Sequence, residues 1–203
     1  MIKTSITLQE LRRKIYLKAK ADKTHRFWGL YVHVCKESTL TESYQLAKRN
    51  NGAPGIDGMT FDDIEKDGVK IFLHGIQEQL VKGTYQPVRN RIKEIPQANG
   101  KTRKLGIATI RDRVVQGAVK LIMEPVFESD FQEGSYGYRP KSTAHHAIER
   151  VAEAVVKEKT RVIDLDLKSY FDTVKHHILL AKIAESIAEE QMLRLGTQMI
   201  KGE

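Results

Sequence analysis

The sequence predicts an α+β fold in which helices predominate and strands are few. Three observations support this prediction: apolar residues recur at helical spacing in several segments, residues 85–109 have the texture of a β-hairpin, and residues 161–167 alternate as a strand does. We therefore expect a helical N-terminal region, a central region that combines helices with a hairpin, and then one strand followed by a helix.

The composition is that of an ordinary soluble protein with a basic excess. The chain has 203 residues, of which 34 are Lys or Arg and 26 are Asp or Glu, and its formal net charge is +8. This excess favours polyanionic partners such as nucleic acid, although a solvated basic surface accounts for it equally well. Cys35 is the single cysteine, which excludes an internal disulfide. The start lacks a signal-peptide core and no stretch reaches ~20 apolar residues, so we expect a cytoplasmic protein and no membrane partner.

Two helices are predicted in the first 50 residues. Residues 7–21 open with a capping box of Thr7 and Glu10, and apolar residues recur among basic ones, so this helix is amphipathic and basic. Its charged face suits nucleic acid or solvent equally. A second capping box, Thr39 with Glu42, predicts the start of the next helix.

The following segment changes from loop to helix. Residues 49–61, RNNGAPGIDGMTF, include three glycines and a proline within seven residues, which predicts a loop with special backbone geometry. Residues 69–82 are predicted to be helical, and Gly83 is placed to end that helix.

A basic β-hairpin is predicted over residues 85–109. Apolar residues on both sides flank a polar Asn-Gly turn, as in two paired strands. The clustered cations give this arm a strongly positive surface, whatever its use. They are Arg89, Arg91, Lys93, Lys101, Arg103 and Lys104.

Two further helices enclose a loop that contains aromatic residues. Apolar stripes predict helices over residues 111–123 and 143–157, the second capped by Ser142. Between them, FESDFQEGSYGYRPKS is predicted to be a loop that brings Tyr138 close to Arg139. Aromatic and Arg side chains together suit stacking on bases, although tyrosines that plug a core edge are equally common.

Two acids interrupt the predicted strand at residues 161–167. Alternation puts Asp164 and Asp166 on one face and three apolar residues on the other. An acid held rigidly at a strand end suits a hard divalent cation such as Mg²⁺, which leaves positions for substrate phosphates. The plainer alternative is a pair of solvated acids on an exposed sheet face. One carboxylate is a partial site, so two-metal chemistry predicts a second acidic segment.

Taken together, these segments resemble the N-terminal half of group II intron-encoded reverse transcriptases, also called maturases. Four stretches follow the family's order: NNGAPGIDGMTF, RNRIKEIPQANGKTRKLGIATIRDRVVQGA, FQEGSYGYRPKSTAHHA and DLDLKSYFDTVKHHILL. The resemblance implies a fold of the reverse-transcriptase fingers-palm type, truncated within the palm. It divides the chain into a helical basic N-terminal extension (1–43), a fingers-like region (44–158), and an incomplete palm with its first strand and helix (159–203).

The resemblance implies one metal-binding, catalytic aspartate. The family's pattern places this aspartate five residues before an aromatic residue, here Phe171, which selects Asp166 and not Asp164. Leu167 would add its backbone carbonyl to the metal, and Mg²⁺ would be the cofactor.

Contacts with nucleotide and nucleic acid are implied as well. Arg103 would hold the triphosphate of the incoming deoxynucleotide, with Lys101 as a weaker candidate. The amides of Ser169 and Tyr170 would face the triphosphate, and the ring of Phe171 would exclude a ribose 2′-OH by steric overlap. The implied nucleic-acid contacts are Tyr138, Arg139, Arg89 and Arg91.

Two departures from the family's pattern affect these expectations. Gln97 stands where the family usually has the lysine of an IPK segment, which should weaken nucleotide binding, and Ala108 replaces a common proline. The chain also ends at QMIKGE, before the PQGG and YADD segments of the family. We therefore expect a fragment that has one of three metal-binding carboxylates and is inactive alone.

The resemblance implies the N-terminal part of an RNA-directed DNA polymerase that uses two-metal phosphoryl transfer. Its partners would be intron RNA, a DNA primer and deoxynucleoside triphosphates. A palm with one strand leaves open edges, so we also expect marginal stability or self-association. Two alternatives are a non-catalytic module that binds intron RNA and assists splicing, and a non-functional remnant.

Overall fold

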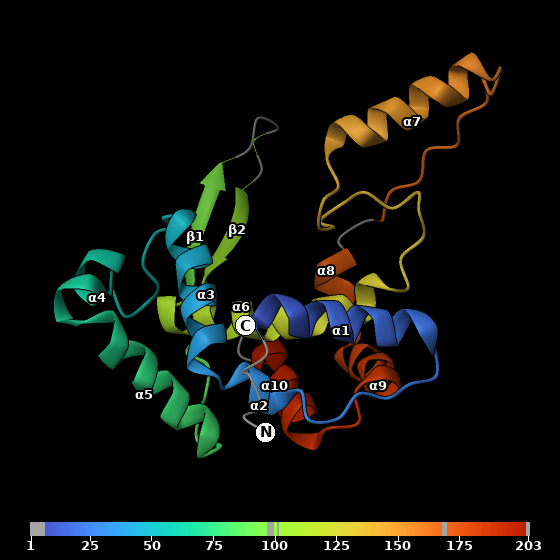
Figure 1. Ribbon diagram of the computed structural model, residues 1–203. Coiled ribbons are helices and arrows are strands. Elements are labelled where there is room, and N and C mark those ends of the chain that lie inside the picture. The colour runs from blue at the N-terminus through green and yellow to red at the C-terminus, as the bar shows by residue number, and fades with distance from the viewer. Residues whose placement is uncertain (1–6, 97–99, 101, 168–169, 202–203) are drawn as a thin grey trace.

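The computed structural model describes residues 7–96, 100, 102–167 and 170–201, and it has the predicted α+β character (Figure 1). One antiparallel pair of strands, β1 (Arg91–Pro96) and β2 (Thr102–Ile107), projects from a helical body. The helices are α1 (Leu8–Ala21), α2 (Tyr31–Val34), α3 (Glu37–Arg49), α4 (Phe61–Asp67), α5 (Val69–Val81), α6 (Ile110–Glu128), α7 (Ala144–Val156), α8 (Tyr170–Thr173), α9 (His176–Ser186) and α10 (Glu190–Lys201). No described helix combines the length and apolar character that crossing a bilayer requires.

The core lies where α1 and α3 pack against α6, the longest helix. Ile110, Val114, Ala118 and Ile122 recur every four residues along α6, so they share one face, and all four are fully buried. The helix predicted over residues 111–123 is therefore confirmed. It extends to Glu128 because its apolar face continues to pack against the rest of the core.

The C-terminal helices α9 and α10 lie close to the N-terminal part of the described chain. Phe27 and Ile187 form an isolated parallel bridge, and the Phe27 N–H donates to the carbonyl of Ser186 at 2.7 Å. Ile187, Met192 and Leu195 are buried in the same core as the N-terminal helices. The end of the segment predicted as palm therefore shares its core with the first part of the chain.

Most predicted helices are present, but two predicted caps are wrong. Helix α3 begins at Glu37, and Thr39 lies inside it with 1% of its surface exposed, so it packs into the core instead of capping the helix. Helix α7 is capped by Thr143 and not by Ser142. In both cases neighbouring residues have similar capping chemistry or spacing, so the sequence alone does not fix the residue at which the helix begins.

The segment at residues 161–167 is not a strand, contrary to the prediction. It has no regular secondary structure, and all seven residues are exposed. A strand needs a neighbour to satisfy its backbone N–H and C=O groups, and the only sheet within the described residues is the β1–β2 pair. The preceding helix α7 also buries none of its residues.

Candidate nucleotide and nucleic-acid interface

The register of the hairpin separates its charges onto two faces. Each residue of β1 lies opposite one of β2, from Arg91 opposite Ile107 to Pro96 opposite Thr102, and opposed residues point to the same side. We name the first side the cationic face because it carries three cations and no acid. It consists of Arg91, Lys93, Ile95, Arg103, Leu105 and Ile107. On the other side, Glu94 lies opposite Lys104 and balances its charge.

The glycine-rich loop at residues 49–61 is fixed against the base of this hairpin. The Nε of Arg91 donates to the carbonyl of Pro54 at 3.0 Å. Arg113 of α6 donates to the carbonyl of Gly52 at 3.2 Å and also to that of Ala53. A Cβ on Gly55 would lie 2.6 Å from Thr109 Cα, so only glycine allows this approach. The special geometry predicted for the loop is thus a close contact with the segment that joins the hairpin to α6.

A buried carboxylate orients the two chain segments that enter and leave the hairpin. Asp112, 1% exposed, accepts hydrogen bonds from the Tyr85 hydroxyl at 2.7 Å, the Thr109 hydroxyl at 2.7 Å and the Val88 N–H at 3.0 Å. Burial and the bond to Asp112 raise the pKa of Tyr85. This network was not predicted from the sequence, although Thr109-x-x-Asp112 has the spacing of an N-terminal cap.

The predicted hairpin cations are not equivalent in the structure. Arg89 and Arg103 are exposed, as a role in binding a polyanion requires. Arg91 is half-buried and holds the Pro54 carbonyl, so its guanidinium already serves the fold. Lys101, like Gln97 and most of the predicted turn, lies outside the described residues.

The loop after α6 holds Arg139 internally and leaves Tyr138 exposed. The Arg139 guanidinium donates to Glu128 Oε1 at 2.6 Å and to the carbonyls of Gln132 and Ser135 at 2.7 and 2.8 Å. The ring of Tyr138 is fully exposed, and its φ is +56°. Tyr138 is therefore accessible for the predicted template contact, whereas Arg139 braces the loop.

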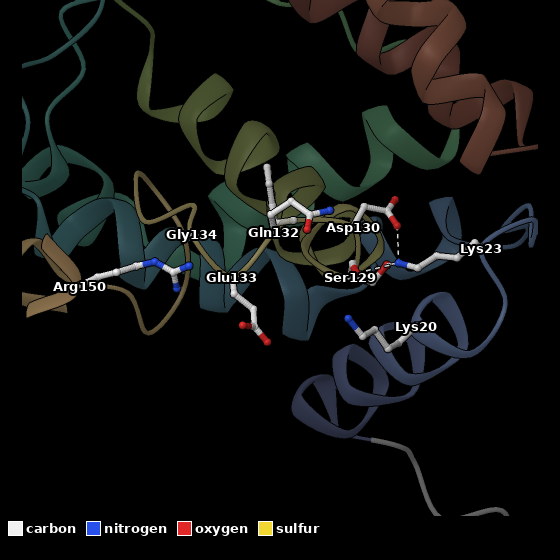
Figure 2. Close-up of a pocket in the computed structure, with 9 residues that line it drawn as sticks. Lys20, Lys23, Ser129, Asp130, Gln132, Glu133, Gly134 and Arg150 are labelled. Carbon is white, nitrogen blue, oxygen red and sulfur yellow. Dashed lines mark hydrogen bonds and ion pairs between the residues drawn. The ribbon is translucent and has the colours of Figure 1, made fainter. Parts of the chain in front are cut away.

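A concave surface lies between α1 and the loop after α6 (Figure 2). It encloses about 650 Å³. Lys23 donates to the Ser129 carbonyl at 2.7 Å and pairs with Asp130. Figure 2 shows Lys20 and Arg150 directed toward the same hollow, and neither has an ion pair within the described residues. This pocket was not predicted, although basic residues recur near the end of α1.

The segment that carries the predicted metal ligand is open to solvent. Asp166 and Leu167 are exposed, and Phe171 of α8 has 85% of its surface exposed, with its ring 5.6 Å from that of Tyr170. Ser169 lies outside the described residues. Within the described part of the chain, no three His, Cys, Asp or Glu residues cluster as a metal site would require. The structure therefore does not assemble a complete metal site around Asp166.

The structure also does not bring Arg103 and Asp166 together. Figure 1 shows the hairpin and α8 at separate places along the helical body. No hydrogen bond or ion pair between described residues links the hairpin to residues 161–167. The two halves of the predicted nucleotide site are therefore separate in this conformation.

Comparison with known proteins gives one family match. The family described as reverse transcriptase (RNA-dependent DNA polymerase) matches residues 94–202, from β1 to the end of α10. Protein YkfC of Escherichia coli K12 is 36% identical over 200 residues, which cover 96% of this chain and 52% of YkfC. Group II intron-encoded protein LtrA of Lactococcus lactis is 29% identical over 178 residues, which cover 86% of this chain and 29% of LtrA.

A plant protein shares a shorter region. Nuclear intron maturase 2 of Arabidopsis thaliana is 27% identical over 85 residues, which cover 42% of this chain and 11% of that protein. The chain thus spans about half the length of YkfC and less than a third of LtrA.

Proposed function

This chain belongs to the reverse transcriptase (RNA-dependent DNA polymerase) family, and we propose that it supplies the nucleotide-binding arm and one metal-binding carboxylate of such a polymerase. The relatives named as a group II intron-encoded protein and an intron maturase support the group II intron type within this family. The proposed nucleic-acid partners are intron RNA and a DNA primer.

The cationic face of the hairpin is the observation that carries this proposal. Its three cations are not balanced by any acid on the same face, so the face favours a compact polyanion such as a triphosphate. Arg103 is exposed there, and a guanidinium binds phosphate through two parallel hydrogen bonds. We assign the triphosphate contact to Arg103, with Lys101 as a second candidate.

We assign the remaining predicted roles to the segment that leads into α8. Asp166 and the Leu167 carbonyl would contribute ligands to Mg²⁺, and the amides of Ser169 and Tyr170 would contact the triphosphate. The described residues do not complete a metal site, so catalysis requires further carboxylates in addition to Asp166. The 203-residue chain alone is therefore expected to be inactive.

The test is whether the chain distinguishes a deoxyribonucleotide from a ribonucleotide. Binding of dATP and of ATP is measured on the chain in the presence of an RNA template annealed to a DNA primer. Phe171 should favour dATP, because in the proposed site its ring would exclude the 2′-OH by overlap, and Phe171→Ala should bind both nucleotides equally. Tyr170→Ala is the matched control and should keep the preference. Equal binding of dATP and ATP by the unsubstituted chain would contradict the proposal.

A primer-extension assay checks the expectation of inactivity. With Mg²⁺, primer, RNA template and all four deoxynucleotides, the purified chain should give no extended product. Template-dependent product that disappears in Asp166→Ala would show that this chain assembles a complete site.

The pocket between α1 and the loop after α6 supports a second candidate function, that of a non-catalytic RNA-binding module. Lys20 and Arg150, which form no ion pair with any described residue, provide positive charge beside the half-exposed ring of Phe131. For single-stranded RNA, the logarithm of affinity should fall with the logarithm of salt by about 0.7 per phosphate neutralised. Lys20→Ala should reduce that slope. Lys18→Ala should not, because Lys18 is already paired with Asp22. Equal slopes would contradict a specific role for the pocket.

A further inference from the structure

We propose that Lys93 is a second phosphate-binding residue of the hairpin and positions the triphosphate together with Arg103. This inference rests on the proposed function of the cationic face. It assigns a role to a residue that lies four positions before the lysine expected in the family's IPK segment.

The strand register places Lys93 beside Arg103. Lys93 is directly opposite Leu105, and Ile95 is directly opposite Arg103. Lys93 and Arg103 are therefore diagonal neighbours on one face, and such pairs have Cβ atoms about 7 Å apart. Both side chains are long enough to converge on a ligand that spans several phosphates.

The other two cations of the strands are placed differently. Arg91 donates to the Pro54 carbonyl, and Lys104 lies opposite Glu94 on the other face. The side chains of Lys93 and Arg103 are exposed and form no hydrogen bond or ion pair with any described residue. They are thus the two cations of the cationic face whose side chains have no partner among the described residues.

The chemistry of a triphosphate suits this pair. A nucleoside triphosphate carries ~4 negative charges. When the Arg guanidinium binds one phosphate through two hydrogen bonds, the other phosphates keep charge that the compact Lys ammonium can bind. Ile95 and Leu105 occupy the other diagonal of the same face, so their apolar side chains flank both cations. Because Gln97 is neutral, Lys93 would supply the charge that the family's lysine otherwise provides.

The experiment compares two lysines of the same hairpin. Binding of dATP and of dAMP to the 203-residue chain is measured by calorimetry at fixed ionic strength. Lys93→Ala should weaken dATP binding about tenfold, because a charge-assisted contact is lost. The effect on dAMP should be less than about twofold, since one phosphate is satisfied by Arg103. Lys93→Arg should restore most of the affinity for dATP.

Lys104→Ala is the matched control. It removes the same charge from the same hairpin but from the opposite face, and it should change dATP affinity by less than about twofold. Equal losses in the two variants would overturn the proposal, because they would show a diffuse charge effect. A loss in Lys93→Ala that is equal for dATP and dAMP would also overturn it.

Arg103→Ala separates this inference from the proposed function. If Arg103→Ala weakens dATP binding and Lys93→Ala does not, the assignment of Lys93 is wrong and the nucleotide-binding arm stands. If the unsubstituted chain does not bind dATP, or Arg103→Ala binds it equally well, both proposals are wrong. Weaker binding of a single-stranded RNA but not of dATP in Lys93→Ala would assign the residue to the RNA backbone and overturn the inference.

Discussion

The phenol of Tyr85 donates a hydrogen bond of 2.7 Å to the buried carboxylate of Asp112. Tyr85 precedes the hairpin and Asp112 lies in the first turn of the helix that follows it, so this contact joins the two ends of the arm. The same carboxylate accepts from Thr109 and from the Val88 N–H. The orientation of the cationic face therefore depends on one acid that does not touch it.

Replacing Asp112 should destabilise the protein. Asp112→Ala leaves the buried Tyr85 and Thr109 hydroxyls without their acceptor, and the free energy of unfolding should fall by about 3 kcal/mol. Urea unfolding followed by circular dichroism measures this change. Asp164→Ala, which removes an exposed acid, should stay within about 0.5 kcal/mol of the unsubstituted chain. A loss below about 1 kcal/mol in Asp112→Ala would show that the network contributes little.

Two glycine substitutions should have effects of opposite sign. Gly55→Ala would place its Cβ 2.6 Å from Thr109 Cα, so the loop must move, and unfolding free energy should fall by about 2 kcal/mol. Gly75→Ala lies within α5, where a Cβ meets nothing within 4 Å, and it should add about 0.5 to 1 kcal/mol. The same denaturation experiment tests both. A stabilised Gly55→Ala variant would contradict the close docking of the loop.

Stability should decrease at mildly acidic pH through His33. Burial lowers the pKa of His33, and nearby Lys36 lowers it further. Because the folded pKa lies below the unfolded value of about 6.5, the contribution is complete above that value and is lost as pH falls toward the folded pKa. His33→Gln should show a smaller loss of unfolding free energy between neutral and mildly acidic pH. An identical pH dependence in both proteins would contradict this prediction.

The exposed apolar face of α7 should promote self-association. Ile148, Val151 and Val155 lie on one face of the helix and are 59 to 65% exposed. A contiguous apolar surface of this kind favours contact between molecules. Sedimentation velocity should show association that increases with concentration, and Val151→Glu should reduce it. Glu149→Gln, on the polar side of the same helix, should associate as the unsubstituted chain does.

Local sequence patterns predicted most helices and the hairpin correctly. The apolar stripe of α6 and the Gly83 stop after α5 depend on residues close together in the chain, so they were visible without a structure. The prediction that Thr39 caps a helix was wrong because Thr39 is buried in the core, and burial depends on residues that are distant in the sequence. The strand at residues 161–167 failed for the same reason, since alternation describes a strand only when a neighbour pairs with it.

The sequence by itself determined the order of the motifs and the family resemblance, because both depend on residue identity and spacing. Only the tertiary structure decided which cations are available to a ligand. Arg91 and Arg139 had the same predicted role as Arg89, yet their guanidinium groups bind Pro54 and Glu128 within the fold. A side chain's chemistry belongs to its residue, whereas its freedom to bind depends on the distant residues that folding brings within hydrogen-bond distance.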